Sequence, residues 1–251
     1  SEPGVLYAGI QPAALFRSKD RGETWELMEE LYDHPQRGQW GPGAGGLCLH
    51  TILLDPENGK RMTVAISAAG AYRTDDDGHT WQPRNKNVPA DFMPERFPEF
   101  GQCVHSVVMA PGKSHRLYQQ NHCGMYRSAD GGQQWQSIEE GLPSSFGFAA
   151  AVHPRDPETL YFVPLNGAME GRYVPDGKAA VSSGPILWPK HSRKSRSMSC
   201  GVETCSCTRY AASLTVNIKT RLETKPGASL TFTGVPTGPS RTCGGKLRTR
   251  W

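Results

Sequence analysis

Residues 18–25 read Ser-Lys-Asp-Arg-Gly-Glu-Thr-Trp, and the pattern returns as Thr-Asp-Asp-Asp-Gly-His-Thr-Trp at 74–81 and as Ser-Ala-Asp-Gly-Gly-Gln-Gln-Trp at 128–135. The common pattern, Ser/Thr-x-Asp-x-Gly-x-x-Trp, predicts a tight turn between antiparallel strands, because hydroxyl and carboxylate oxygens accept backbone N–H groups inside such a turn. Gly supplies the positive φ, and Trp packs on nearby apolar side chains. The positions with these structural roles are Ser18, Asp20, Gly22, Trp25, Thr74, Asp76, Gly78, Trp81, Ser128, Asp130, Gly132 and Trp135.

Strand-forming runs precede the second and third turns at a constant spacing. Residues 47–54 and 61–66 lead to the second turn, and residues 103–109 and 117–120 lead to the third; Pro, Gly and Asn bound each run. One more strand after each Trp gives four strands in a unit of about 55 residues. The sequence therefore predicts an all-β fold, a β-propeller built of four-stranded antiparallel blades.

The three turns resemble the Asp-box, or bacterial neuraminidase (BNR), repeat. The segments Leu-Tyr-Ala-Gly at 6–9 and Tyr-Arg-Thr-Asp-Asp at 72–76 are similar to bacterial sialidase-like and glycosyl hydrolase-like proteins of the sialidase/sortilin-type propeller superfamily. This resemblance covers residues 5–180 and implies a propeller with Asp-box turns. Hydrolases, receptors and assembly factors share that architecture, so the resemblance does not by itself select a function.

The repeat breaks in the fourth unit. That unit begins at 148–152 and 160–163, and Trp188 stands where a fourth turn would end, yet residues 181–187 contain no Asp. The net charge changes there too, from −6 over residues 1–180 to +10 over residues 181–251. We therefore expect a partial propeller of about three and a half blades over 1–180, too few to close a ring, and a basic, repeat-breaking tail over 181–251.

Three explanations stay open for the tail. It is a disordered segment that binds an anionic partner, a small domain held by its four cysteines, or the product of a reading frame lost near Val181. The abrupt loss of repeat and composition inside a blade favours the third explanation.

The composition of the chain limits which partners and which cellular compartment we expect. No apolar run approaches the roughly 18 residues of a membrane span, and a total charge of +4 that averages two opposite segments predicts no nucleic-acid partner. We assign no cofactor and no metal. The first 180 residues hold three cysteines and no Asn-x-Ser/Thr sequon, which favours a reducing compartment, although a removed signal peptide would equally fit.

Two histidines occupy equivalent places in adjacent blades. Cys48-x-His50 and Cys103-x-His105 lie in the inner strands, where strand alternation puts Cys and His on one face. In one interpretation, these histidines point toward the mouth of the propeller's central channel, where they hold a metal ion or act as an acid and a base. In the other, they fill the inner wall of the channel and hydrogen-bond to the next blade. The turn at 121–124 reaches the same end, so the predicted ligand-binding residues are His50, His105, Asn121 and His122.

Two long connections, at residues 32–40 and 91–100, combine carboxylates, arginine and aromatic rings, a mixture that suits sugar recognition. In residues 32–40 we select Arg37 and Trp40 as ligand-binding. A glycosidase would also need a carboxylate pair, for which Asp33, Glu95 and Glu99 are candidates; solvated loop charges are the alternative. The Arg-Ile-Pro motif of sialidases is absent. The leading prediction is a propeller with a glycan- or small-ligand-binding site at the channel mouth, glycosidase- or sialidase-like by resemblance; the alternative is a non-catalytic propeller that binds a protein or peptide.

Overall fold

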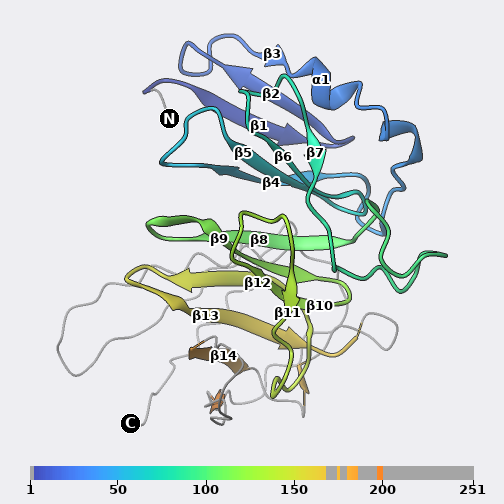
Figure 1. Cartoon of the computed structure of the whole chain (residues 1–251), viewed down its shortest axis with the longest axis vertical. Helices are drawn as coiled ribbons and strands as arrows, with labels where there is room; N and C mark the ends of the chain where they lie inside the picture. Colours follow the sequence, from blue (N-terminus) through green and yellow to red (C-terminus); the bar gives the residue numbers. More distant parts are fainter. Residues whose placement is uncertain (1–2, 168–173, 176–179, 186–196, 200–251) are drawn as a thin grey trace, which may run out of the picture.

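A computed structural model of the chain describes residues 3–167, 174–175, 180–185 and 197–199. Its strands form four antiparallel sheets that follow one another in chain order along the long axis of the molecule (Figure 1). Sheet 1 consists of β1 (Leu6–Ile10), β2 (Ala14–Ser18) and β3 (Glu26–Leu27). Sheet 2 consists of β4 (Leu49–Leu54), β5 (Met62–Ile66), β6 (Gly70–Thr74) and β7 (Gln82–Pro83).

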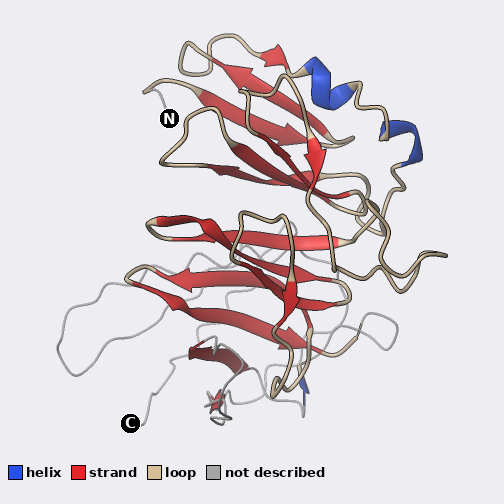
Figure 2. Ribbon diagram, in the orientation of Figure 1, coloured by secondary structure: helices blue, strands red, loops and turns tan. Residues whose placement is uncertain are grey.

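The two remaining sheets repeat this order. Sheet 3 consists of β8 (Val104–Ala110), β9 (Lys113–Asn121), β10 (Gly124–Ser128) and β11 (Gln136–Ser137). Sheet 4 consists of β12 (Phe146–His153), β13 (Asp156–Leu165), β14 (Ala180–Pro185) and β15 (Ser197–Ser199). Helix α1 (Glu29–Tyr32) and the 3-10 turn η1 (Arg37–Gln39) lie in the connection from sheet 1 to sheet 2 (Figure 2). Among the described residues, no helix combines the length and apolarity needed to cross a membrane.

The prediction of an incomplete propeller of four-stranded blades is confirmed. In sheets 2 and 3 the Trp-containing turn joins the third strand to the fourth, whereas in sheet 1 it joins the second strand to the third. Strands β1 and β2 therefore correspond to β5 and β6, and within the described part of the chain sheet 1 has no counterpart of β4. Most of residues 181–251 lie outside the described residues, so the explanations offered for the tail stay predictions.

The three turns share one hydrogen-bonding scheme. The Ser18 hydroxyl accepts the N–H of Gly22 at 2.7 Å, and the Asp20 carboxylate accepts the N–H of Thr24 at 2.9 Å. Thr74 with Asp76, and Ser128 with Asp130, accept the corresponding groups at 2.8 to 3.0 Å. The turn glycines have φ values of 99°, 93° and 87°, which L-residues rarely adopt. These contacts explain why the same residue types recur in all three turns.

The core is divided among the spaces between sheets. Three clusters of buried side chains join sheets 1 and 2, sheets 2 and 3, and sheets 3 and 4. Representative members of the three clusters are Leu15 and Leu49, Val107 and Leu117, and Tyr118 and Leu160. Sheets 2 and 3 thus bury both faces against their neighbours, whereas sheets 1 and 4 each bury one face in these clusters, so the stability of each sheet depends on the sheet beside it.

Arginines near the turns also link consecutive sheets. Arg17 of β2 donates to the Asp77 carboxylate in the second turn at 2.8 Å, and Arg73 of β6 donates to the Gly131 carbonyl in the third turn at 2.9 Å. Asp77 and Gly131 occupy the same place in their turns. The arginine that precedes each of the first two turns therefore contacts the turn of the next blade.

Candidate functional site

One end of the sheets gathers the predicted ligand-binding residues. The turns between β5 and β6 and between β9 and β10 lie at this end, together with the connections that enter β4, β8 and β12. Because antiparallel strands reverse at each turn, the Trp-containing turns lie at the opposite end. We call the first end the mouth end.

His50 and His105 each occupy a β-bulge. Leu49 and Thr51 pair with consecutive residues of β5, which leaves His50 as the extra residue; Val104 and Ser106 pair with consecutive residues of β9, which leaves His105 extra. A bulge bends the strand and re-aims the extra side chain. The repeated Cys-x-His of the sequence therefore coincides with a repeated irregularity of the backbone.

Both histidines hydrogen-bond to the next inner strand. The Nε2 of His50 lies 3.0 Å from the Val104 carbonyl, and the Nδ1 of His105 lies 2.6 Å from the Gly147 carbonyl. A carbonyl only accepts, so each of these nitrogens carries a proton. Both histidines thus make the hydrogen bond to the next blade that the inner-wall alternative predicts, and their role in ligand binding stays a prediction.

The two imidazoles nevertheless present different remaining nitrogens. His50 directs Nδ1 to the Thr51 hydroxyl at 2.8 Å, and desolvation lowers its pKa below the usual value, with the Val104 carbonyl offsetting part of the shift. His105 directs Nε2 to the Cys103 thiol, 3.5 Å away. Of these two histidines, His105 alone belongs, within the described part of the chain, to a group of side chains with metal-binding chemistry.

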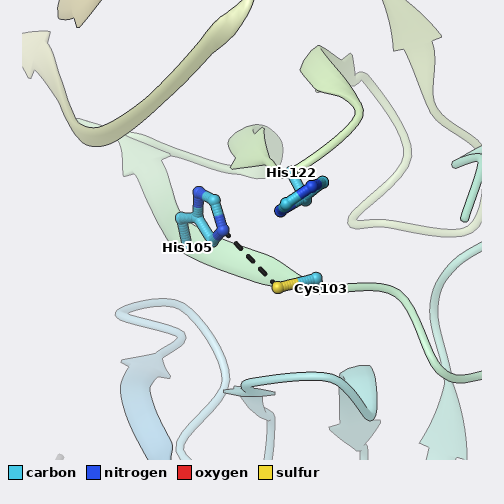
Figure 3. A group of neighbouring side chains, drawn as sticks. All are labelled: Cys103, His105 and His122. Atoms are coloured by element: carbon cyan, nitrogen blue, oxygen red, sulfur yellow. Dashed lines mark hydrogen bonds between the residues drawn. The ribbon is translucent and has the colours of Figure 1, made fainter. Parts of the chain in front are cut away.

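That group consists of Cys103, His105 and His122, whose ligand atoms all lie within 4.8 Å of one another. Figure 3 shows the thiol and the two rings facing a common space. A backbone hydrogen bond of 2.9 Å from the His122 N–H to the Cys103 carbonyl holds the two segments together. In sheet 2 the equivalent bond runs from Ser67 to Cys48, so Ser67 occupies the place of His122.

Aromatic rings surround the three side chains. The His105 ring stacks on Phe148 with centroids 4.6 Å apart, and Phe146 meets the rings of both histidines edge-on at 5.3 to 5.4 Å. Phe92 meets His122 at 5.6 Å. Phe146 and Phe148 replace the Cys and His of the preceding blades, so an apolar wall faces the polar group.

Arg37 and Trp40 have structural partners. The Arg37 guanidinium donates to the Ala13 carbonyl at 2.7 Å and lies over the Tyr32 ring. Trp40 is buried and donates through Nε1 to the Tyr72 hydroxyl at 2.8 Å. Burial raises the pKa of Tyr72, whose phenol donates onward to Gln36 at 2.9 Å. Both predicted ligand residues thus secure the connection between sheets 1 and 2.

Asn121 is likewise engaged within the fold. Its side chain is fully buried, its Oδ1 accepts the N–H of Cys123 at 2.9 Å, and its Nδ2 donates to Gln119 at 3.4 Å. The amide caps the turn that carries His122. Asn121 therefore positions this turn instead of facing the exposed mouth end.

The three candidate carboxylates lie in different settings. Asp33 ends helix α1, and Glu95 is exposed in the second long connection. The Glu99 carboxylate accepts the Gln36 amide at 2.9 Å, which ties the two long connections together. Their assignment to a glycosidase pair stays a prediction.

One feature was not among the predicted site residues: the loop at 91–100, which exposes several large apolar side chains. Phe92 and Phe97 are each 50% exposed and Met93 is 37% exposed. Arg96 donates to Asp91 at 3.1 Å and lies over the Phe97 ring. The sequence signal was the aromatic content of this connection, from which we had selected only the carboxylates Glu95 and Glu99.

Buried amides hold this loop in place. Gln102, fully buried, donates to the Pro98 carbonyl at 2.7 Å and to the Val88 carbonyl at 3.2 Å. Asn85 donates to the Glu99 carbonyl at 3.0 Å. The exposed rings of the loop are therefore presented on a fixed backbone.

Comparisons with known proteins place these features in context. The family model Sortilin-Vps10, described as "Sortilin, neurotensin receptor 3", matches residues 13–172. None of the curated proteins searched matches the chain. Similar solved structures include an ancestral GH74 enzyme at 18% identity and TM-score 0.45, covering 64% of this chain and 19% of that one.

Two further structures belong to the same comparison. The GH74 enzyme of Niastella koreensis is 18% identical, with a TM-score of 0.43; the match covers 72% of this chain and 26% of that enzyme's chain. YCF48 bound to D1 peptide is 15% identical, with a TM-score of 0.45, and covers 79% and 50%. The chain spans between about a fifth and a half of the length of these three structures.

Proposed function

Because the chain belongs to the Sortilin-Vps10 family, we propose that it is a non-catalytic propeller that binds a peptide or protein segment at the mouth end. The description of the family names a neurotensin receptor. A propeller that serves as a receptor needs a recognition surface but no reactive pair of carboxylates. The observation that carries the proposal is the exposed apolar loop at 91–100, beside the cluster of Cys103, His105 and His122.

The composition of the loop supports a protein or peptide ligand. Aromatic residues, Met and Arg are enriched in protein interfaces, and Phe92, Met93, Arg96 and Phe97 supply all three kinds within six positions. Large exposed apolar side chains that gather in one loop mark an interaction site more strongly than scattered ones do. Phe92 and Phe97 are the expected anchors.

Pre-organisation of the loop supports the same conclusion. Gln102 and Asn85 fix its backbone from below, and the ion pair of Arg96 with Asp91 crosses it. A loop already held in its bound conformation avoids part of the ordering cost of association. Its rings can therefore contribute more of their buried area to affinity.

Glycan binding is the second candidate. The exposed Phe92 and Phe97 would stack on sugar faces, and Glu95 lies between them in the sequence. Hydrolysis would further require a carboxylate pair roughly 5–10 Å apart across the scissile bond. The engagement of Glu99 with Gln36 favours binding over hydrolysis.

A random peptide library displayed on phage and selected on the immobilised full chain tests the proposal. We expect enriched peptides whose affinity falls at least about tenfold in a variant carrying Phe92→Ala and Phe97→Ala, because loss of interface anchors has this size. Leu54→Ala is the control, since Leu54 is another exposed apolar side chain, at 37%, and lies in β4 outside the loop.

Two outcomes would overturn peptide binding. One is equal affinity in the double variant and the Leu54→Ala control. The other is enrichment of no peptide together with a glycan array that binds the unaltered chain and loses binding in the double variant, which would favour the glycan candidate.

A further inference from the structure

We propose that Cys103, His105 and His122 form a binding site for a single transition-metal ion of the zinc class. A thiol and two imidazoles are the donor set that Zn²⁺ takes in proteins, and here one donor atom from each lies within 4.8 Å of the other two. This site is separate from peptide recognition, and either can fail without the other.

The spacing of the donors fits a tetrahedral ion. Zn–S and Zn–N bonds of about 2.3 and 2.0–2.1 Å at tetrahedral angles put S and N about 3.5 Å apart. The Cys103 Sγ and the His105 Nε2 are 3.5 Å apart. The remaining separations are no more than 4.8 Å, so an inward movement of the His122 ring by at most about 1.5 Å would complete the tetrahedral spacing.

The hydrogen bond on the far side of His105 selects the nitrogen that faces the ion. A metal-binding histidine commonly donates its other ring N–H to a backbone carbonyl, which sets the tautomer and the ring orientation. The His105 Nδ1 makes this bond to Gly147 at 2.6 Å. The neutral ring therefore carries its lone pair on Nε2, the atom that faces the Cys103 sulfur.

The backbone brings the three donors together from two strands. Cys103 and His105 flank the start of β8, and the bulge at His105 turns the imidazole out of the regular ladder. The His122 turn is attached to Cys103 by a backbone hydrogen bond and is capped by the buried Asn121. The donors thus depend on local geometry that forms with sheet 3 itself.

The preceding blade provides an internal comparison. Sheet 2 has the Cys and the bulged His, as Cys48 and His50, but Ser67 replaces the third donor, and His50 uses Nε2 for the Val104 carbonyl. Sheet 4 has Phe146 and Phe148 in place of Cys and His. The apolar rings of sheet 4 lower the local polarity around the sheet 3 donors, which strengthens metal–ligand interactions.

Three protein donors leave one tetrahedral position for a water molecule or another small donor. The site is therefore of the open kind, in which the fourth ligand exchanges. No step of a reaction is assigned to it.

Cobalt serves as a spectroscopic probe for the zinc-class ion in the first experiment. The full chain is purified without a histidine tag and with Cys200, Cys205, Cys207 and Cys243 replaced by Ser, because these thiols would also bind metal. We expect one equivalent of Co²⁺ to bind with a thiolate-to-cobalt charge-transfer band in the near ultraviolet, and Zn²⁺ to displace it.

Single variants identify the donors. Cys103→Ser should abolish the band, and His105→Ala and His122→Ala should each weaken Co²⁺ binding at least about tenfold, the lower end of the effect seen even for residues that only orient metal ligands. Cys123→Ser is the control, since Cys123 is in the same turn but outside the cluster. Retention of the band in Cys103→Ser, or equal affinity in His122→Ala and Cys123→Ser, would overturn the site.

A second measurement needs no variant and so does not depend on how the variants fold. Zn²⁺ should slow alkylation of Cys103 in the unaltered chain at least about tenfold while leaving Cys48 unaffected, as measured by mass spectrometry of the labelled peptides. Cys48 is the matched thiol, because both are partly buried at equivalent places. Identical rates at the two thiols with and without Zn²⁺ would contradict the proposal.

Discussion

At the scale of single residues, the turn tryptophans show that the same position of the repeat can differ in burial, and so in its contribution to stability, from one blade to the next. Trp135 is 1% exposed and its indole N–H donates to the Arg84 carbonyl of the preceding sheet at 2.8 Å. Trp25 is 42% exposed and donates within its own turn, to Gly22. Burial depends on the neighbouring blade, which the repeat pattern does not describe.

We expect Trp135→Ala to lower the free energy of unfolding by about 3–5 kcal/mol, the usual cost of truncating a buried aromatic residue. Trp25→Ala should cost about 1 kcal/mol, because much of its surface is already in water. Urea denaturation followed by far-ultraviolet circular dichroism measures both. Equal costs would mean that the inter-sheet position of Trp135 contributes nothing.

The turn carboxylates predict how stability responds to acid. Hydrogen bonds from the Thr80 hydroxyl and N–H lower the pKa of Asp76 from 3.8 to about 2, and the equivalent bonds from Thr24 lower that of Asp20. Since these folded-state pKa values are lowered, their stabilisation is complete above the ordinary pKa and disappears as the pH falls toward 2.

Asp76→Asn should therefore make the free energy of unfolding less dependent on pH between about pH 4 and pH 2. Urea titrations at several pH values across this window measure the slope. Glu23→Gln, which neutralises an exposed acid in the first turn, is the control and should leave the slope unchanged. An Asp76→Asn slope equal to that of the unaltered chain would contradict the role of the hydrogen bonds.

Residue roles at the mouth end were harder to predict than residue roles in the turns. The hydroxyl and carboxylate groups of the turns bond within eight positions of the sequence, so the pattern alone contains their partners. Arg37 and Trp40 instead contact Ala13 and Tyr72, which lie 24 and 32 positions away in the sequence. A ligand role was predicted for both because these partners are not visible in the local pattern.

At the scale of elements, the contact between β1 and β4 controls how sheets 1 and 2 meet. A Cβ atom on Gly9 of β1 would lie 2.5 Å from the Leu49 carbonyl oxygen and 2.4 Å from its side chain. Real Cβ atoms do not approach a backbone oxygen so closely, so any larger residue at position 9 would push the two strands apart.

Gly9→Ala should accordingly destabilise the chain by about 1–3 kcal/mol, the usual cost of overpacking. Gly59→Ala provides the matched control, because a Cβ at position 59 meets nothing within 4 Å. Thermal unfolding of the two variants under identical conditions compares them. A Gly9→Ala protein as stable as Gly59→Ala would show that the strands separate at little cost.

The strands themselves were predictable, whereas their irregularities were not. Runs of β-branched and aromatic residues between Pro, Gly and Asn indicated β4, β5, β8 and β9 within a few positions. The bulges at His50 and His105 arise from how β4 and β8 pair with β5 and β9, and the sequence of one strand contains no record of that pairing. The bulge in β8 re-aims His105, whose Nε2 lies 3.5 Å from the Cys103 sulfur.

At the scale of the whole molecule, three separate cores between four sheets hold the described residues together. Each sheet contacts only its neighbours, so damage to one core should unfold the adjacent sheets first. Sheet 1, with three strands where sheets 2 and 3 have four, leaves the edge of β1 without a counterpart of β4 among the described residues.

The change of charge at residue 181 leads to a prediction about the gene. We propose that the native reading frame is lost near Val181, since the repeat and the acidic residues cease together inside the fourth unit. Sequencing the source gene should reveal a second frame that encodes a fourth Ser/Thr-x-Asp-x-Gly-x-x-Trp turn near position 189. A second frame without such a turn would contradict the proposal.

The order of strands, the turns and the incomplete propeller follow from the sequence, because each depends on residues close together in the chain and is repeated three times. The sequence also places Cys103 and His105 on one face and His122 at the same end, but the approach of their ligand atoms to within 4.8 Å, and the exposure of Phe92 and Phe97, follow only from the tertiary structure. They depend on the pairing of β8 with β9, which sets the bulge at His105 and the turn that carries His122, and on a loop held by Gln102; the sequence of one strand contains no record of these contacts.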